Sequence, residues 1–127
     1  MKRAIRTEKA PKPVGPYSQA IEVGNTLYIS GQIGIEPATG ELPSDFTSQV
    51  RQVLRNAEEI LISAGYSKEN VVRVTIYLRD LSKFGEFNTL YEEFFTGIDP
   101  KPARVTVGVK ELPLGADVEI ELIAVKD

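Results

Sequence analysis

The stretch "KPARVTVGVKELPLGADVEIEL", residues 101–122, contains two segments with alternating apolar residues, separated by a Pro-Gly turn. Both segments predict short β-strands. Arg104 stands at the start of the first, valine-rich strand, and Glu119 and Glu121 alternate with apolar residues in the second. These charges either face solvent or form a polar site on one face of a sheet, and the rest of the chain has to decide between the two.

Upstream of this stretch, the pattern predicts four more strands. Residues 2–8 fit an edge strand, and residues 20–33 read as two strands joined by Gly24-Asn25, a strong hairpin signal. Residues 70–80 are β-branched and alternate in polarity, which predicts a further strand. The Pro- and Gly-containing segments 9–18 and 34–45 predict irregular loops.

Two helices are predicted from apolar residues that recur every three or four positions. The first covers residues 46–64, with Ser44 or Asp45 as its N-cap and Gly65 as its stop. The second covers residues 82–95 and carries an apolar stripe with four aromatic side chains. The resulting order β-β-β-α-β-α-β-β, within a single domain of residues 1–127, predicts a two-layer α/β (α+β) sandwich. Both helices would lie on one face of a mixed sheet.

Alternation along the strands divides the sheet into two faces. The face expected under the helices carries Leu27, Ile29, Val72, Val74, Ile76, Leu78, Val105, Val107, Val109, Val118, Ile120 and Leu122. The opposite face would carry Tyr28, Ser30, Arg73, Thr75, Tyr77, Arg104, Thr106, Glu119, Glu121, Ile123 and Val125. Periodicity alone leaves two interpretations of this second face open: an ordinary half-exposed surface, or a subunit interface with a polar pocket at its edge.

Composition excludes several kinds of chemistry. The 127 residues include no Cys and no His, which excludes thiolate nucleophiles, Cys- or His-ligated metals, and imidazole acid–base catalysis. No nucleotide-binding motif is present. A net charge of −3 with scattered basic residues argues against a nucleic-acid partner, because a duplex binder needs a basic stripe. No membrane span or signal peptide is evident, so we expect a cytoplasmic protein.

Four motifs carry a resemblance to a known family. "GPYSQA" (15–20), "ISGQI" (29–33), "FNTLYEEFF" (87–95) and "PARVTVGVKELPLGADVEIEL" (102–122) resemble the RidA (YjgF) family of reactive-intermediate deaminases, in order and along essentially the whole chain. The resemblance implies a chorismate-mutase-like fold assembled as a homotrimer, with sites between subunits and with no metal or cofactor. It also implies hydrolysis of 2-imino acids, including 2-iminobutanoate and 2-iminopropanoate, to 2-keto acids and ammonia, which limits damage by reactive metabolites.

The resemblance also implies roles for particular residues. Arg104 would hold the substrate carboxylate and Glu119 would stand near the attacking water, which makes them the catalytic pair. The substrate-binding residues would be Arg104 with Tyr17, Ser30, Asn88 and the backbone N–H of Gly31. An arginine fork suits a carboxylate because it can donate two parallel hydrogen bonds. Glu119 could take a proton from water and return it to the departing nitrogen.

Other interpretations remain. Many family members have a cysteine two residues after the signature arginine, where this chain has Thr106, so thiol-dependent behaviour cannot apply. Arg104 could instead pair with Glu119 or Glu121 across neighbouring strands. The alternative function is a module that binds 2-keto acids or related small carboxylates without turnover. RNA cleavage, credited to some relatives, is disfavoured by the acidic balance.

Overall fold

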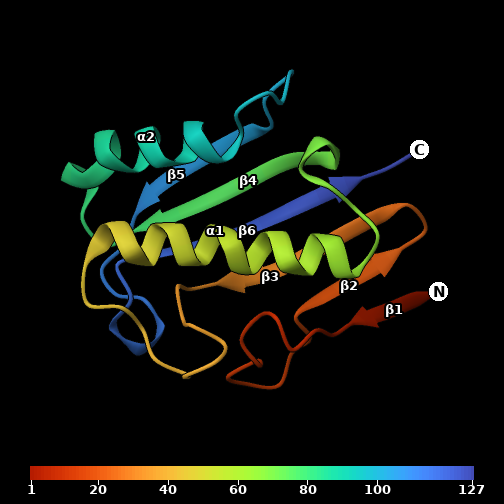
Figure 1. The fold of residues 1–127 in the computed structure, drawn as a ribbon, viewed down its shortest axis with the longest axis horizontal. Helices are drawn as coiled ribbons and strands as arrows, with labels where there is room; N and C mark the ends of the chain where they lie inside the picture. The colour runs from red at the N-terminus through yellow and green to blue at the C-terminus, as the bar shows by residue number, and fades with distance from the viewer.

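The computed structural model describes all 127 residues and contains one six-stranded sheet with the strand order β1-β2-β3-β6-β4-β5. The elements, in chain order, are β1 (Lys2–Ile5), β2 (Ala20–Val23), β3 (Thr26–Gln32), α1 (Phe46–Ser63), β4 (Val71–Leu78), α2 (Phe84–Phe94), β5 (Ala103–Gly108) and β6 (Val118–Val125). Both helices lie on the same face of the sheet (Figure 1), which confirms the predicted two-layer sandwich. Neither helix has the length and apolar character needed to cross a bilayer.

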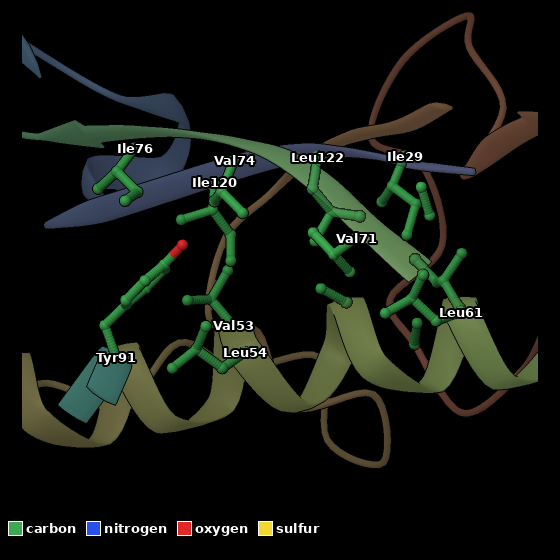
Figure 2. Packing of buried hydrophobic residues seen from close by; sticks show 14 of the residues in the cluster. Ile29, Val53, Leu54, Leu61, Val71, Val74, Ile76, Tyr91, Ile120 and Leu122 are labelled. Atoms are coloured by element: carbon green, nitrogen blue, oxygen red, sulfur yellow. The ribbon is translucent and has the colours of Figure 1, made fainter. Parts of the chain in front are cut away.

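Helix α1 forms where the periodicity predicts it, and its ends follow from local chemistry. The Asp45 side chain accepts a hydrogen bond from the Ser48 N–H at 3.0 Å and caps the first turn. Gly65 has φ of +85°, a conformation that glycine adopts without steric cost, and it stops the helix. The apolar stripe of α1, which includes Val53, Leu54 and Leu61, packs against β3, β6 and β4, as Figure 2 shows. Each such side chain contributes roughly 1.5–3 kcal/mol by leaving water.

Helix α2 is shorter and covers the β4–β5 end of the sheet (Figure 1). Phe87, Leu90 and Tyr91 are buried, while Phe84, at the start of the helix, remains 43% exposed. Tyr91 reaches from α2 toward the strands in Figure 2, and its hydroxyl is buried without a hydrogen-bond partner. The hydroxyl stays protonated, because burial raises the pKa of Tyr91 to about 12.

The strand before α2 corrects one residue of the predicted core. Val71 is buried and Val72 is 45% exposed, so Val72 does not belong to the face under the helices. The cause is a register shift between Val71 and Arg73 in the pairing of β4 with β6. A bulge of this kind inserts an extra residue and reverses the alternation at the strand's beginning.

The two strands of the 101–122 stretch are not neighbours. β6 lies inside the sheet between β3 and β4, whereas β5 is an edge strand that pairs with β4 in parallel. The connecting segment has left-handed residues at Leu114 (φ 57°) and Gly115 (φ 70°) and carries the chain past β4 instead of closing a hairpin. The structure therefore excludes an ion pair between Arg104 and either glutamate across adjacent strands.

Two buried amide side chains, Gln19 and Asn56, fix the loops next to β3. Gln19 accepts from the Thr7 N–H and donates to the carbonyls of Thr7 and Pro11, which ties down the loop before β2. Asn56 on α1 donates to the carbonyls of Ile33 and Ile35 at 3.1 and 2.9 Å. A buried polar group that is satisfied in this way holds backbone in place without the cost of an unpaired donor. The sequence reading did not single out these anchors.

Candidate functional site

Arg104 lies on the face of the sheet that α2 covers, not on the opposite face as the alternation had suggested. In the parallel pairing of β4 and β5, Arg104 stands beside Val74, which is buried under the helices. Thr106 shares this face, and Val105 and Val107 point to the open side, each 37% exposed. The assignment of β5 to its two faces was therefore wrong by one residue throughout.

The guanidinium of Arg104 is held by two oxygen acceptors. Its Nε donates to the Thr106 Oγ1 at 3.0 Å, and its Nη2 donates to the Asn88 Oδ1 at 2.5 Å. An arginine has five N–H donors in a rigid fork, so three remain on Nη1 and Nη2 for a ligand. The fork is thus oriented by neutral partners and keeps donors for a planar anion.

Aromatic rings complete the surroundings of Arg104. Its Cζ lies 4.8 Å from the ring centroid of Tyr91, 5.4 Å from that of Phe84 and 5.5 Å from that of Phe87. No carboxylate forms an ion pair with it. A cation stacked on aromatic faces keeps its charge while it is partly removed from water. The open cleft in front of it, lined by Phe84, Asn88, Tyr91, Glu92, Lys101, Pro102, Arg104 and Thr106, has a volume of about 670 Å³.

Glu119 lies in a second cleft, on the opposite face of the sheet. This cleft has a volume of about 420 Å³ and is lined by Val14, Tyr17, Ser30, Gly31, Ile33, Pro113, Glu119 and Glu121. The pairing of β3 with β6 shifts register between Ile29 and Gln32, because Ile29 pairs with Leu122 and Gln32 pairs with Ile120. β3 therefore has one extra residue here, and Ser30 and Gly31 lie in a β-bulge. The Glu119 carboxylate fills the space over Gly31, where an added Cβ would lie 1.9 Å from Oε2.

The electrostatics of Glu119 differ from those of a surface carboxylate. Burial raises its pKa above the ordinary value, and the neighbouring Glu121 carboxylate raises it further. No hydrogen bond and no cation offset these two effects within the chain. Glu119 is therefore suited to hold and release a proton nearer neutral pH than an exposed glutamate does.

Tyr17 and Ser30 line the second cleft, but part of their hydrogen-bonding capacity is used locally. The Tyr17 hydroxyl accepts from the Val14 N–H at 3.2 Å, and the side chain is 46% exposed. The Ser30 hydroxyl donates to the Ser18 carbonyl at 2.6 Å, which joins β3 to the loop that carries Tyr17. Ser30 therefore helps to shape the cleft and keeps only acceptor capacity for a ligand.

The structure brings the expected site residues together in two groups, not one. Arg104 and Asn88 form the arginine half-site; Tyr17, Ser30, Gly31 and Glu119 form the glutamate half-site. Arg104 is level with Leu122 two strands away, and Glu119 lies three residues before Leu122 on β6. From ordinary strand spacings, their Cα atoms are about 14 Å apart, and their side chains leave opposite faces. No small substrate can contact both within one chain.

Several residues of these half-sites were not among the expected ones. Thr106, Phe84, Phe87 and Tyr91 surround Arg104, and Tyr77 reaches the glutamate half-site. The aromatic stripe of the second helix was visible in the sequence, but its proximity to Arg104 depends on how α2 docks on β5. No group of three or more His, Cys, Asp or Glu residues is placed to hold a metal ion.

Comparison with known proteins places the chain in a family. The model of the endoribonuclease L-PSP family matches residues 7–126. A RutC family protein of Aquifex aeolicus is 60% identical, over 98% of this chain and 99% of that protein. The mouse 2-iminobutanoate/2-iminopropanoate deaminase is 45% identical, over 99% of this chain and 93% of that protein.

Solved structures agree with this placement. The crystal structure of RidA from a Psychrobacter species has a TM-score of 0.94 at 45% identity and covers 98% of this chain and 99% of its own. The structure of E. coli TdcF with bound serine has a TM-score of 0.95 at 37% identity, with coverage of 98% and 99%. The fold is thus the chorismate-mutase-like one of YjgF and RidA proteins. The chain belongs to the endoribonuclease L-PSP family, which includes the RutC, YjgF and RidA proteins, and the resemblance is confirmed.

Proposed function

We propose that this protein hydrolyses 2-imino acids, formed from 2-aminoacrylate and its homologues, to 2-keto acids and ammonia. The observation that carries the proposal is Arg104, a half-buried guanidinium without an ion pair, fixed by Asn88 and Thr106 at the edge of an open cleft. Such an arginine fits a small planar carboxylate, which every 2-imino acid carries. The name of the 45% identical mouse relative supports the same substrate class.

In this reaction the glutamate half-site would activate the attacking water. Water adds to the carbon of the protonated C=N bond, and the Glu119 carboxylate takes the proton that the water loses. Glu119 then returns that proton to nitrogen and takes the proton of the carbinolamine hydroxyl as the C–N bond breaks and the C=O bond forms. The keto acid and ammonia leave, and ammonia carries off the last proton as ammonium, which restores the Glu119 carboxylate. A carboxylate with a raised pKa suits both proton transfers, because its pKa lies closer to the pH at which the protein works.

The separation of the half-sites supports a site between subunits. Because Arg104 and Glu119 leave opposite faces of the sheet, a complete site needs Arg104 from one copy and Glu119 from a second copy. The open face also exposes Tyr28, Val105, Val107 and Val125 together, an apolar surface that a neighbouring copy would bury. We propose the homotrimer that the resemblance implies, with three such sites.

Gly31→Ala is expected to lower the turnover number by about 10²-fold, the effect of a misplaced reacting group. The added methyl would overlap the Glu119 carboxylate and displace it. The matched control is Gly85→Ala in α2, where an added Cβ meets nothing within 4 Å, and which should retain turnover and gain up to about 1 kcal/mol in stability. Rates and melting temperatures of both variants would be measured. Wild-type turnover in a folded Gly31→Ala protein would contradict the placement of Glu119.

The proposal is tested by coupling a pyridoxal-phosphate dehydratase to this protein and measuring how fast keto acid forms from several amino acids. We expect faster formation with the protein than without it, and the preferred amino acid reveals the imine side chain. Binding of a keto acid without any acceleration would instead support the non-catalytic carboxylate-binding module. Salt-dependent RNA binding, or the RNA cleavage after which the endoribonuclease L-PSP family is named, would favour a different function.

A further inference from the structure

Two carboxylates share the glutamate half-site, and only one of them has a hydrogen-bond donor. Glu119 and Glu121 are two residues apart on β6, so both point to the open face, with Cα atoms about 7 Å apart. Both line the same cleft. Two carboxylates this close do not ionise independently, and the first to ionise raises the proton affinity of the other.

Tyr77 makes the two carboxylates unequal. In the register of β4 with β6, Tyr77 stands directly opposite Glu119, yet its hydroxyl donates to Glu121 Oε1 at 2.5 Å. A donor to a carboxylate favours the ionised form. Tyr77 keeps its hydroxyl proton, because the hydrogen bond to Glu121 and burial both raise the pKa of Tyr77. The Glu121 carboxylate is therefore held by a hydrogen-bond donor, while Glu119 has neither a donor nor a cation.

The other charged and titratable groups near the pair do not change this asymmetry. On β4, Arg73 is level with Ile123, four residues beyond Glu119, and forms no ion pair. Arg79, just after β4, is already paired with Asp117 at 2.5 Å. Tyr28 on β3 is level with Ile123, and Tyr17 in the loop accepts from the Val14 N–H. Within this chain, no cation neutralises either carboxylate.

We propose that Glu121, held by Tyr77, is a positioning residue whose fixed negative charge makes Glu119 the proton-carrying carboxylate of the cleft. The inference rests on the proposed function. In that reaction the proton taken from water stays on Glu119 and is delivered to nitrogen from there. Burial and the Glu121 charge both raise the pKa of Glu119, which agrees with this division of roles.

The test is Glu121→Gln, which keeps the shape and removes the charge. At the spacing of the two Cα atoms, about 7 Å, the loss of a unit negative charge lowers a neighbouring carboxyl's pKa by about one unit, so the acid limb of the kcat profile should move down by about one pH unit. Tyr77→Phe removes only the donor that holds the Glu121 carboxylate in place, so the limb should move the same way by less. Glu69→Gln, the same charge change at an exposed residue in the 3-10 turn just before β4, should leave the profile unchanged.

A second measurement separates this inference from the proposed function. The side-chain carbon of Glu119, assigned by its disappearance in Glu119→Gln, can be titrated by NMR whether or not the protein turns over any imine. We expect its pKa to be lower in Glu121→Gln and in Tyr77→Phe than in the wild type. An unmoved titration in folded Glu121→Gln overturns the role of Glu121, whatever the activity. Absence of imine hydrolysis in the wild type would overturn the proposed function instead.

Discussion

Arg104→Ala is expected to lower kcat/KM for imine hydrolysis by about 10²- to 10⁴-fold. Charge-assisted hydrogen bonds contribute roughly 1.5–3 kcal/mol each, and a carboxylate held by two of them loses both. The free donors of the guanidinium, fixed by Thr106 and Asn88, are the reason to expect a loss at the upper end of this range. The measurement is the coupled rate over a range of imine concentrations, on protein of verified fold.

Lysine provides the comparison for this substitution. Arg104→Lys keeps the charge but loses the fork and the stacking on Phe84 and Tyr91, so it should recover only part of what alanine loses. Because Arg104 forms no ion pair, we expect either variant to lose only about 1 kcal/mol of stability, mainly from cation–π contacts. Full activity in folded Arg104→Ala would show that this arginine takes no part in the reaction.

Glu119→Gln is expected to lower turnover by roughly 10²-fold or more, the usual contribution of general acid–base catalysis. The amide cannot take the proton that water loses, whereas its size and its contact with Gly31 remain nearly the same. Affinity for a keto-acid product should change much less, since the carboxylate is held at the other half-site. Unchanged turnover would mean that water or another group relays the proton.

Glu119→Gln should lower activity without lowering stability. The pKa of Glu119 is raised in the folded protein, so the folded state binds the proton more tightly than the unfolded state does. Its contribution to stability is therefore present below the unfolded pKa and is lost as pH rises through the folded pKa. At neutral pH the glutamine removes an uncompensated charge, so the melting temperature should stay equal or rise. A large drop in melting temperature would show that Glu119 is structural.

Much of the fold could be predicted because its signals are local. Asp45 and Gly65 mark the ends of α1 by capping chemistry, and Gly24-Asn25 joins β2 to β3. The apolar spacing of residues 46–64 reflects a helix with one face in the core. Such features depend on a few neighbouring residues, so they can be read without knowing the tertiary structure.

The order of the strands in the sheet, and the face to which each side chain of β5 points, could not be predicted from the same signals. β5 carries Val105 and Val107 on one side and Arg104 on the other, and burial of valine under the helices was the natural expectation. In the structure the two faces of β5 are exchanged. Arg104 packs among aromatic rings under α2, and Val105 and Val107 lie on the open face of the sheet. The position of β4 between β5 and β6 likewise depends on long-range pairing.

The candidate site was predicted only in part. The motifs identified Arg104, Glu119, Tyr17, Ser30, Gly31 and Asn88 through the family resemblance, and their chemical roles stay predictions. Periodicity alone could not reveal the two half-sites, because it does not give strand order. Tyr77 and Glu121 were visible only as alternating residues, and their hydrogen bond depends on the register of β4 with β6.

The central claim, that one site uses Arg104 from one subunit and Glu119 from another, is tested most directly by subunit complementation. Arg104→Ala and Glu119→Gln chains would be co-expressed with different tags, the mixed oligomer purified, and its mass checked by light scattering for three chains. In a closed ring of three, every mixed trimer has one of its three sites with both wild-type residues, so about one third of wild-type activity should return in the purified mixed trimers. Mixed trimers that remain as inactive as the separate variants would contradict the shared site.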